Sequence, residues 1–391
     1  MSLDKREKLK YYIISIIIQP LVRVYASFFP LQDNKFFCIS MYGKNYGDNI
    51  KSLSDYIECN KTQAIIVWGF SDSFFNRVDI PNKCKLCTFK YYYHVYTSKF
   101  VLTNFSMDYY FVSFKRKGQV FYQTWHGTAL KKIGYDVLVN EQRGRINTWL
   151  AEWRLRGFVR MTDVLVSGSR FMTNIYKEKF LYNKTVYEIG TPRNDLFFKE
   201  DFQITNKVKK AFSIPSSTKI LLYAPTFRAD RKFTYYDVDL EKIKKFWEKR
   251  FNSSCVLLVR LHANMMGKDR QFMEMFPNGT RDASHYPDMQ ELLYSSDVLV
   301  TDYSSSMFDF MYLKRPIILY VRDRETYSRG FYFNIDSLPF IIVNDNSEID
   351  NKLSCYDEKE YDKLIDIFIN EIGSVEKGKA TEESFNLLMN Y

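Results

Sequence analysis

Several signatures of common enzyme classes are missing from this 391-residue sequence. It contains neither of the glycine-rich phosphate loops, GxGxxG and GxxxxGK[ST], which argues against dinucleotide oxidoreductases and P-loop enzymes. It also lacks the GxSxG elbow of serine hydrolases. Asp237 and Asp239 form a DxD pair, but no apolar strand precedes them, so we interpret this pair as chance. We therefore expect neither a metal site nor a cofactor.

Cysteine is sparse, with six residues scattered along the chain. Cys84 and Cys87 form one CxxC pair, but no second pair follows at the spacing of a zinc site. We interpret the cysteines as free thiols in a reducing compartment.

No apolar run is long enough to span a bilayer, which needs about 20 residues. The longest candidate, residues 11–22, contains Pro20 and ends at Arg23, and four basic residues precede it within the first ten positions. It has no small-residue cleavage site. Two interpretations remain open: residues 1–30 form a membrane-associating segment, or they form a first helix packed on the domain.

The net charge of +10, from 56 basic and 46 acidic residues, suits an anionic partner such as a nucleotide, a polyphosphate, a membrane or a nucleic acid. Its distribution is dispersed and no RNA-binding motif is present, so we expect no nucleic-acid partner. The oligomeric state cannot be inferred from the sequence, and an oligomer is possible.

Short apolar runs separated by helical stretches predict two successive parallel α/β layers. A polar, lysine-rich stretch separates the two sets, and we place the domain boundary after residue 205, with domains at 31–205 and 206–391. In such layers ligands bind at the carboxyl ends of the strands. The expected strands are 36–41, 64–69, 98–103, 120–124, 163–167, 186–189, 219–223, 255–261, 298–301 and 316–320.

His126 is one of only four histidines and lies in the segment QTWHGTALKK, directly after an expected strand. A strand-to-helix turn presents its side chain at the sheet edge, where the amides of Gly127 and Thr128 face an anion. Imidazole titrates near neutrality, which suits proton transfer. We favour this functional interpretation over a capping or core histidine.

A second histidine, His262, alternates with Arg260 around Leu261 at the end of an apolar run. Residues two apart on a strand share one face, so the guanidinium and the imidazole together predict a phosphate clamp. Pro225 and Thr226 follow another expected strand and are further candidates for contacts with a nucleotide diphosphate, as is Arg193.

Three serines, Ser304 to Ser306, follow the expected strand 298–301 and precede a helical stretch. Hydroxyls and free amides at a helix start bind phosphate, although serine is also simply a good helix cap. Asp309 lies about one turn further on and is a candidate acceptor for sugar or glycerol hydroxyls.

Five ordered motifs, WHGTALK, TPRND, APTFR, RLH and TDYSSSMFDF, resemble the CDP-glycerol glycerophosphotransferase family, whose members build teichoic acids and related capsule polymers. The resemblance covers roughly residues 35–370 and is closest to the shorter, primase-like members. It implies an α/β, GT-B-type fold with two Rossmann-like domains facing across a cleft. The first domain would bind the acceptor and the second the CDP-alditol.

The resemblance also implies roles for individual residues. His126 would be the general base, and His262 a second catalytic histidine in the donor pocket. Two departures, Ala129 in place of a common proline and Thr191 in place of a common aromatic residue, weaken any inference about the alditol. The implied substrate-binding residues are Gly127, Thr128, Ala129, Leu130, Arg193, Pro225, Thr226, Arg260, Leu261, Ser304, Ser305 and Asp309.

The implied reaction transfers glycerol phosphate from CDP-glycerol to a hydroxyl of a lipid-linked (undecaprenyl diphosphate) saccharide acceptor in teichoic acid or capsule polymer synthesis, and releases CMP. The implied location is peripheral, on the cytoplasmic side of the cell membrane. Trp149 and Trp153 on an expected helix at 140–162 either dock on anionic headgroups or pack inward. The alternatives are a ribitolphosphotransferase using CDP-ribitol and a GT-B glycosyltransferase using a nucleotide sugar.

Overall fold

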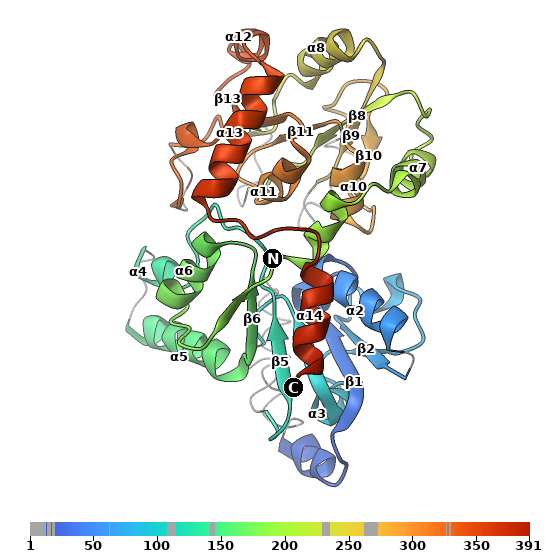
Figure 1. Cartoon of the computed structure of the whole chain (residues 1–391), viewed down its shortest axis with the longest axis vertical. Coiled ribbons are helices and arrows are strands. Elements are labelled where there is room, and N and C mark those ends of the chain that lie inside the picture. Colours follow the sequence, from blue (N-terminus) through green and yellow to red (C-terminus); the bar gives the residue numbers. More distant parts are fainter. Residues whose placement is uncertain are drawn as a thin grey trace. The chain divides into compact units, whose positions relative to one another are not determined.

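The structure is a computed structural model that describes residues 13, 17, 20–61, 63–107, 115–140, 145–228, 235–261, 273–325, 327 and 330–391, and within 138–154 only the side chains of residues 149, 152 and 153. The chain forms two compact units (Figure 1). Unit 1 comprises Met1–Gly127, Ile133–Asp195 and Ser374–Tyr391, and unit 2 comprises Thr128–Lys132 and Leu196–Gly373.

Unit 1 contains a seven-stranded sheet in the order β3-β2-β1-β4-β5-β6-β7, in which all paired strands are parallel. Its first six strands follow the order of a Rossmann sheet. The strands are β1 (Gln32–Ile39), β2 (Ile65–Phe70), β3 (Lys83–Lys85), β4 (Ser98–Thr103), β5 (Val120–Gln123), β6 (Val164–Ser167) and β7 (Val186–Glu188). The helices are α2 (Asp48–Asn60), α3 (Phe89–Thr97), α4 (Tyr135–Asn140), α5 (Arg145–Met161), α6 (Arg170–Lys179) and α14 (Ala380–Met389), with the 3₁₀ turns η1 (Met41–Gly43), η2 (Phe75–Arg77) and η3 (Pro192–Phe198).

The second half of the central strand β1 is buried on both faces, which explains its continuous run of phenylalanine and other apolar residues. Phe36 stacks on Phe100 of β4 with ring centroids 4.8 Å apart, in the core that also holds α2. Phe37 faces the opposite side and meets Tyr91 of α3 at 5.3 Å. Successive side chains thus fill two cores, as the period of a strand requires.

Unit 2 contains a six-stranded parallel sheet in the order β10-β9-β8-β11-β12-β13, which is the strand order of a Rossmann domain. The strands are β8 (Lys219–Tyr223), β9 (Cys255–Val259), β10 (Arg281–Asp282), β11 (Val298–Thr301), β12 (Ile317–Tyr320) and β13 (Ile341–Val343). The helices are α7 (Phe202–Ala211), α8 (Leu240–Phe251), α10 (Met289–Ser295), α11 (Ser306–Phe310), α12 (Ile349–Ser354) and α13 (Glu358–Glu371), with the 3₁₀ turns η6 (Met311–Leu313) and η7 (Ile335–Ser337).

The end of the chain returns to unit 1, where α14 lies beside α2 (Figure 1). The carboxylate of Asp195 caps α14 by accepting the N–H groups of Ala380 (2.9 Å) and Thr381 (2.8 Å). Tyr122 of β5 also donates a hydrogen bond of 2.5 Å to Ser384 inside the core. The second domain expected from the sequence spans residues 206–391. In the structure the chain leaves unit 1 after Asp195 and re-enters it at Ser374, because these contacts hold its last helix.

Within the described residues, no helix has the length and apolar character needed to cross a bilayer. All six cysteines are unbridged, and Cys84 and Cys87 are buried.

Candidate functional site

His126 lies just beyond the carboxyl end of β5, on a sharp turn. The helix expected to begin at Gly127 and Thr128 does not form: the described residues 127–134 are not helical, and the next helix, α4, begins at Tyr135. Trp125 has φ +53°, a left-handed conformation that costs a non-glycine residue about 1 kcal/mol or more. Its N–H donates to the side-chain oxygen of Gln123 (2.8 Å), and its ring packs against His126 (centroids 4.8 Å apart) and Phe180 (4.7 Å). The tight turn is therefore stabilised by a local hydrogen bond and by aromatic packing.

Three further residues of unit 1 hold this turn. Arg193, on η3, donates from Nη2 to the backbone carbonyl of His126 (2.8 Å) and from Nη1 to the carboxylate of Asp48 (3.0 Å). Asn49 accepts the backbone N–H of Arg193 (3.1 Å) and donates to the hydroxyl of Thr124 (3.1 Å). The segments that follow β1, β5 and β7 are thereby linked through side chains.

The environment of His126 keeps its imidazole neutral. Burial lowers the pKa of His126 to about 4; Asp48 raises it and Arg193 lowers it. Its Nδ1 is buried and has no hydrogen-bond partner within the described part of the chain. Burial alone would raise the pKa of Asp48, but Arg193 and the Asn49 N–H outweigh burial and lower it, so Asp48 is an anion. At neutral pH His126 can accept a proton.

The rest of the first motif continues into unit 2. Gly127 has φ +83°, which only glycine adopts without strain. Lys131 then forms a β-bridge with Phe331, the carbonyl of the buried residue Leu130 accepts the Tyr332 N–H (2.8 Å), and the Lys132 N–H donates to Gly330 (2.8 Å). Thr128, Ala129 and Leu130 therefore belong to unit 2, whereas His126 and Gly127 belong to unit 1.

In unit 2, Pro225 and Thr226 follow β8, as predicted, and Thr226 is held by Asp302 from the end of β11. The carboxylate of Asp302 accepts the N–H of Thr226 (2.9 and 3.1 Å) and its hydroxyl (3.0 Å). Strands β8 and β11 are neighbours. This pair therefore lies where the strand order reverses, the usual position of a ligand in an open parallel sheet.

Arg228 is the centre of a buried charge cluster behind Thr226. It pairs with Asp323 through two hydrogen bonds (2.7 and 3.1 Å) and with Asp302 at 3.0 Å. The rings of Tyr303 and Tyr327 lie 5.0 and 5.1 Å from its guanidinium carbon. Burial lowers the pKa of Arg228, but these carboxylates outweigh burial and raise it. Because the ion pairs join residues that follow β8, β11 and β12, the cluster holds these three loops together.

Strand β9, the neighbour of β8, ends at Val259, two residues earlier than expected, so Arg260 lies just after the strand and not on its face. Its side chain is partly exposed. It donates to the carbonyl of Tyr286 (2.7 Å), and burial lowers its pKa to about 10, so it remains cationic. The N–H of Leu261 donates to the Ser284 hydroxyl (3.0 Å). His262, the other half of the predicted clamp, lies outside the described residues.

The serine turn follows β11. Ser304 and Ser306 hydrogen-bond through their hydroxyls (2.9 Å), and Ser305 precedes α11 without capping it through its side chain. The helix has only five residues, so its dipole offers less than the sequence suggests. Asp309 is buried and accepts a hydrogen bond from Gln290 (3.0 Å).

Sequence reasoning missed Asp48, Arg228, Asp302 and Asp323. Two of them stand in motifs that the sequence shows, Arg228 in APTFR and Asp302 in TDYSSS. Asp48 begins α2 and Asp323 lies in the loop after β12, both without a recognisable motif, so only the fold reveals them. The DxD pair is structural, because Asp237 accepts the hydroxyl of Tyr320 (2.9 Å) and Asp239 caps α8.

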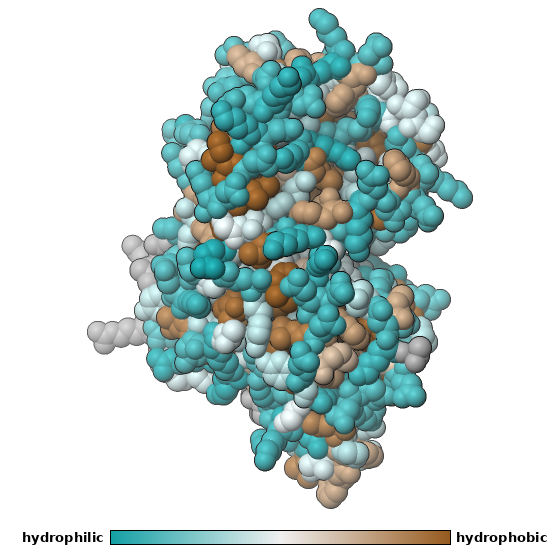
Figure 2. All heavy atoms as spheres, in the orientation of Figure 1, coloured by the Kyte–Doolittle hydropathy of each residue, from teal (hydrophilic) through white to brown (hydrophobic). Residues whose placement is uncertain are grey.

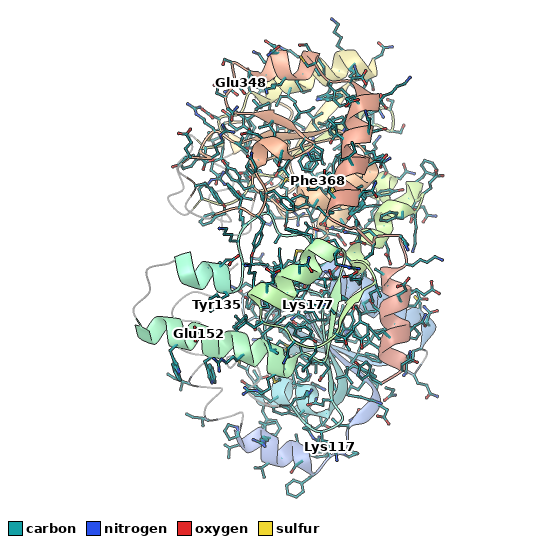
Figure 3. The ribbon with its side chains drawn as sticks, turned by 60° about the vertical axis from the view of Figure 1, so that its left-hand side comes forward. Lys117, Tyr135, Glu152, Lys177, Glu348 and Phe368 are labelled. Atoms are coloured by element: carbon teal, nitrogen blue, oxygen red, sulfur yellow. The ribbon has the colours of Figure 1, made fainter. Side chains whose placement is uncertain are left out.

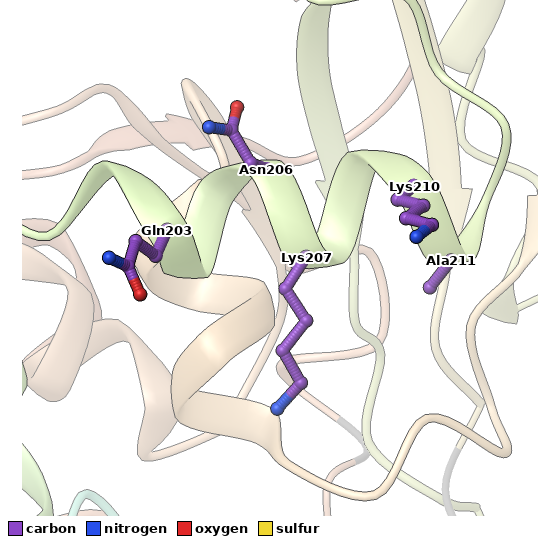
Figure 4. A pocket seen from close by; sticks show the side chains of 5 residues that line it. All are labelled: Gln203, Asn206, Lys207, Lys210 and Ala211. Atoms are coloured by element: carbon purple, nitrogen blue, oxygen red, sulfur yellow. The ribbon is translucent and has the colours of Figure 1, made fainter.

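A separate shallow hollow lies along α7 and contains no predicted site residue (Figure 4). Lys207, one of its lining residues, pairs with Glu291 at 2.6 Å. The hollow is lined by Gln203, Asn206, Lys207, Lys210 and Ala211.

Two parallel sheets, each with the strand order of a Rossmann domain, make this a GT-B-type α/β protein, as the sequence predicted. Residues 22–390 match the model of the family described as CDP-Glycerol:Poly(glycerophosphate) glycerophosphotransferase. The chain belongs to this family.

Among its relatives, a teichoic acid glycerol-phosphate transferase of Staphylococcus aureus is 31% identical over 88% of this chain and 90% of its own length. A teichoic acid poly(glycerol phosphate) polymerase of Staphylococcus epidermidis is also 31% identical over 88% of this chain, but this match spans about half (48%) of the relative. Of solved structures, a variant of the wall teichoic acid polymerase TagF soaked with CDPG is similar with a TM-score of 0.81, 25% identity and coverage of 99% of this chain and 98% of that one.

Proposed function

We propose that this protein transfers glycerol phosphate from CDP-glycerol to a hydroxyl of a lipid-linked saccharide during teichoic acid synthesis. The observation that carries this proposal is a neutral, partly exposed His126 at a strand end, in a chain that belongs to the glycerophosphotransferase family. An imidazole with a pKa below neutrality is unprotonated at pH 7 and, where it is partly exposed, can accept a proton from an alcohol.

In the proposed reaction, an acceptor hydroxyl oxygen attacks the β-phosphorus of CDP-glycerol. A new phosphodiester bond forms, the bond between the β-phosphorus and the bridging oxygen breaks, and CMP leaves with that electron pair. His126 takes the hydroxyl proton, a contribution typically worth about 10²–10⁴-fold in rate.

The donor's negative charge needs fixed positive and polar groups, since electrostatic stabilisation carries most of phosphoryl transfer. Arg260 is partly exposed and cationic at the end of β9. Thr226, Ser304 and Ser305 stand at the ends of the neighbouring strands β8 and β11. We assign the diphosphate to this edge of unit 2.

Calorimetric titration of the wild-type protein with CDP-glycerol, CDP-ribitol and UDP-glucose tests the donor. CDP-glycerol is expected to bind, and Arg260→Ala to weaken it about 10-fold or more, the value of a charged hydrogen bond. Binding of CDP-ribitol alone would make the protein a ribitolphosphotransferase. Binding of UDP-glucose alone would place it among the glycosyltransferases and overturn the proposal.

A lipid-linked acceptor requires contact with a membrane, and an apolar stripe in unit 1 supports a peripheral position on a membrane surface. Five side chains at helical spacing are between 49% and 79% exposed: Ile13, Ile17, Leu21, Val24 and Phe28. The tip formed by residues 20–28 shows this apolar surface in Figure 2. Residues 20–27 are helical, and on the other face of this helix Val22 and Ala26 are buried in the core.

Basic residues lie beside this stripe. Arg116 fastens the helix by donating to the carbonyls of Ala26 (3.0 Å) and Phe29 (2.9 Å), and Lys117 lies next to it (Figure 3). An apolar face flanked by basic side chains fits the surface of an anionic bilayer.

Helix α5 offers a second surface, because Trp149 and Trp153 are 62% and 40% exposed and so do not pack fully inward. Binding to vesicles with and without anionic lipid, measured for a double variant of each surface, tests the two surfaces separately. Leu21→Asn with Phe28→Ser is expected to reduce binding to anionic vesicles, as is Trp149→Ala with Trp153→Ala. Unchanged binding by either double variant would remove that surface from the proposal.

A further inference from the structure

The side chain of Arg193 is committed to partners inside unit 1. It is only 8% exposed, and its two terminal nitrogens reach the carboxylate of Asp48 (3.0 Å) and the carbonyl of His126 (2.8 Å). A guanidinium fixed in this way has little surface left for a diphosphate. The resemblance implied that Arg193 binds the substrate, but in the structure its side chain points to Asp48 and His126.

The rest of TPRND is engaged in the same unit. The N–H of Thr191 (3.0 Å) and the side-chain amide of Asn194 (3.2 Å) both donate to Glu376, and Asp195 caps α14. The motif thus anchors the returning C-terminal segment on one side and the His126 turn on the other.

Asp48 is held in an unfavourable backbone conformation. It begins α2 with φ +67°, a region that costs a non-glycine residue about 1–3 kcal/mol. Such strain persists where surrounding contacts demand it. Here the carboxylate accepts the Asn49 N–H (2.6 Å) and Arg193, and it is largely buried.

We infer that Asp48 and Arg193 are positioning residues for His126, and that Arg193 acts through His126 instead of contacting the donor. Arg193 fixes the carbonyl of His126, and Asp48 fixes Arg193. This inference rests on the proposed role of His126 as the base.

The pair also balances the charge around the imidazole. Among the described residues, the charged groups that act on His126 are Asp48 from α2, which raises its pKa, and Arg193 from η3, which lowers it. Trp125, on its own turn, contributes an uncharged ring. Because the two charges oppose each other, neutralising each one separately must move the titration of His126 in opposite directions.

Nuclear magnetic resonance of histidine-labelled protein tests this without any substrate. Only four histidine signals are expected, and His126→Gln assigns the relevant one. Asp48→Asn is expected to lower the pKa of His126, and Arg193→Gln to raise it. Shifts in the same direction, or no shift in either variant, would overturn the inference. Arg170→Gln, which breaks the exposed pair with Glu188 in the same unit, is the matched control and should leave the signal unchanged.

Kinetics separates positioning from donor binding. Arg193→Gln is expected to reduce kcat about 10²-fold, the cost of a misplaced catalytic group, while the Kd for CDP-glycerol stays within about 2-fold of wild type. Arg193→Lys keeps the charge but not the forked geometry. The pKa of His126 should therefore stay at its wild-type value in this variant, while turnover should still fall. A 10-fold weaker Kd with unchanged kcat would instead make Arg193 a donor ligand.

The two readouts also separate this inference from the proposed function. If the wild-type protein does not turn over CDP-glycerol, the proposed function fails, and the opposite titration shifts still decide whether the pair positions His126.

Discussion

The two units present polar side chains at the same kind of sheet edge but use them differently. In unit 1, Asp48 and Arg193 surround a neutral imidazole whose Nδ1 has no hydrogen-bond partner in the described part of the chain. In unit 2, Arg228 pairs with two carboxylates and lies against the rings of Tyr303 and Tyr327. One edge holds a group ready to accept a proton, and the other holds a rigid frame of paired charges.

This difference shows that equal topology does not assign equal roles. Both sheets follow the Rossmann strand order, and in both the polar residues follow the carboxyl ends of strands. The roles come from the side chains that each edge carries and from how fully they are paired. Substitutions that disturb one unit at a time can therefore test the comparison.

The largest effect is expected from His126→Ala, which removes the proposed base from unit 1. Turnover of CDP-glycerol should fall about 10²–10⁴-fold, because general-base assistance is lost. Affinity for CDP-glycerol should hardly change, because the donor is assigned to unit 2. Steady-state rates and calorimetry on the same preparation measure both. Near-normal turnover would remove His126 from the role of base.

Arg228→Met breaks the frame of unit 2 instead. It leaves Asp302 and Asp323 buried without their cation, which typically costs about 3–5 kcal/mol of stability. Hydrogen exchange measured by mass spectrometry should show faster exchange in β8, β11 and β12, and unchanged exchange in the sheet of unit 1.

The control for this substitution is Arg322→Met, which breaks the more exposed pair with Asp237 in the same unit. An exposed pair contributes little, about 0–1 kcal/mol, so exchange should stay near wild type. Equal effects of the two substitutions would contradict the central place given to Arg228.

The sequence predicted the parallel layers and most strand ends, because apolar runs followed by polar turns depend on local composition. The positions of His126, Thr226 and Arg260 followed from those ends. The ion pair of Asp48 with Arg193 could not be predicted, because 145 residues separate its partners and only the fold joins them. The same holds for the return of α14 to unit 1, which depends on contacts with the distant residue Asp195.

The stability of unit 1 should depend on pH through His126, and that of unit 2 should not. Burial lowers the pKa of His126 to about 4, below its value of about 6.5 in an unfolded chain. Between these values the unfolded chain binds the proton first, so stability is full above pH 6.5 and falls as the pH drops toward 4. The loss is up to about 3 kcal/mol, from 1.36 kcal/mol per pKa unit.

Hydrogen exchange at pH 7 and pH 5 measures this loss in unit 1, after correction for the intrinsic exchange rates. His126→Gln should reduce the pH dependence of unit 1 and leave that of unit 2 unchanged. His94, whose pKa burial also lowers to about 4, should sustain part of the dependence in the variant. A pH dependence of unit 1 that is the same in His126→Gln and wild type would show that His126 titrates normally.

The smallest effect concerns helix caps, one in each unit. Asp195→Ala removes the acceptor of the Ala380 and Thr381 N–H groups and should cost about 1 kcal/mol, localised to α14. Asp357→Ala removes the cap of α13, where the carboxylate accepts the Glu360 N–H (2.9 Å), and should loosen only that helix. Faster exchange of α14 in the first variant and of α13 in the second would establish that the last helix is stabilised as part of unit 1. Loosening of α13 by Asp195→Ala would mean that the final segment is coupled to unit 2 as well.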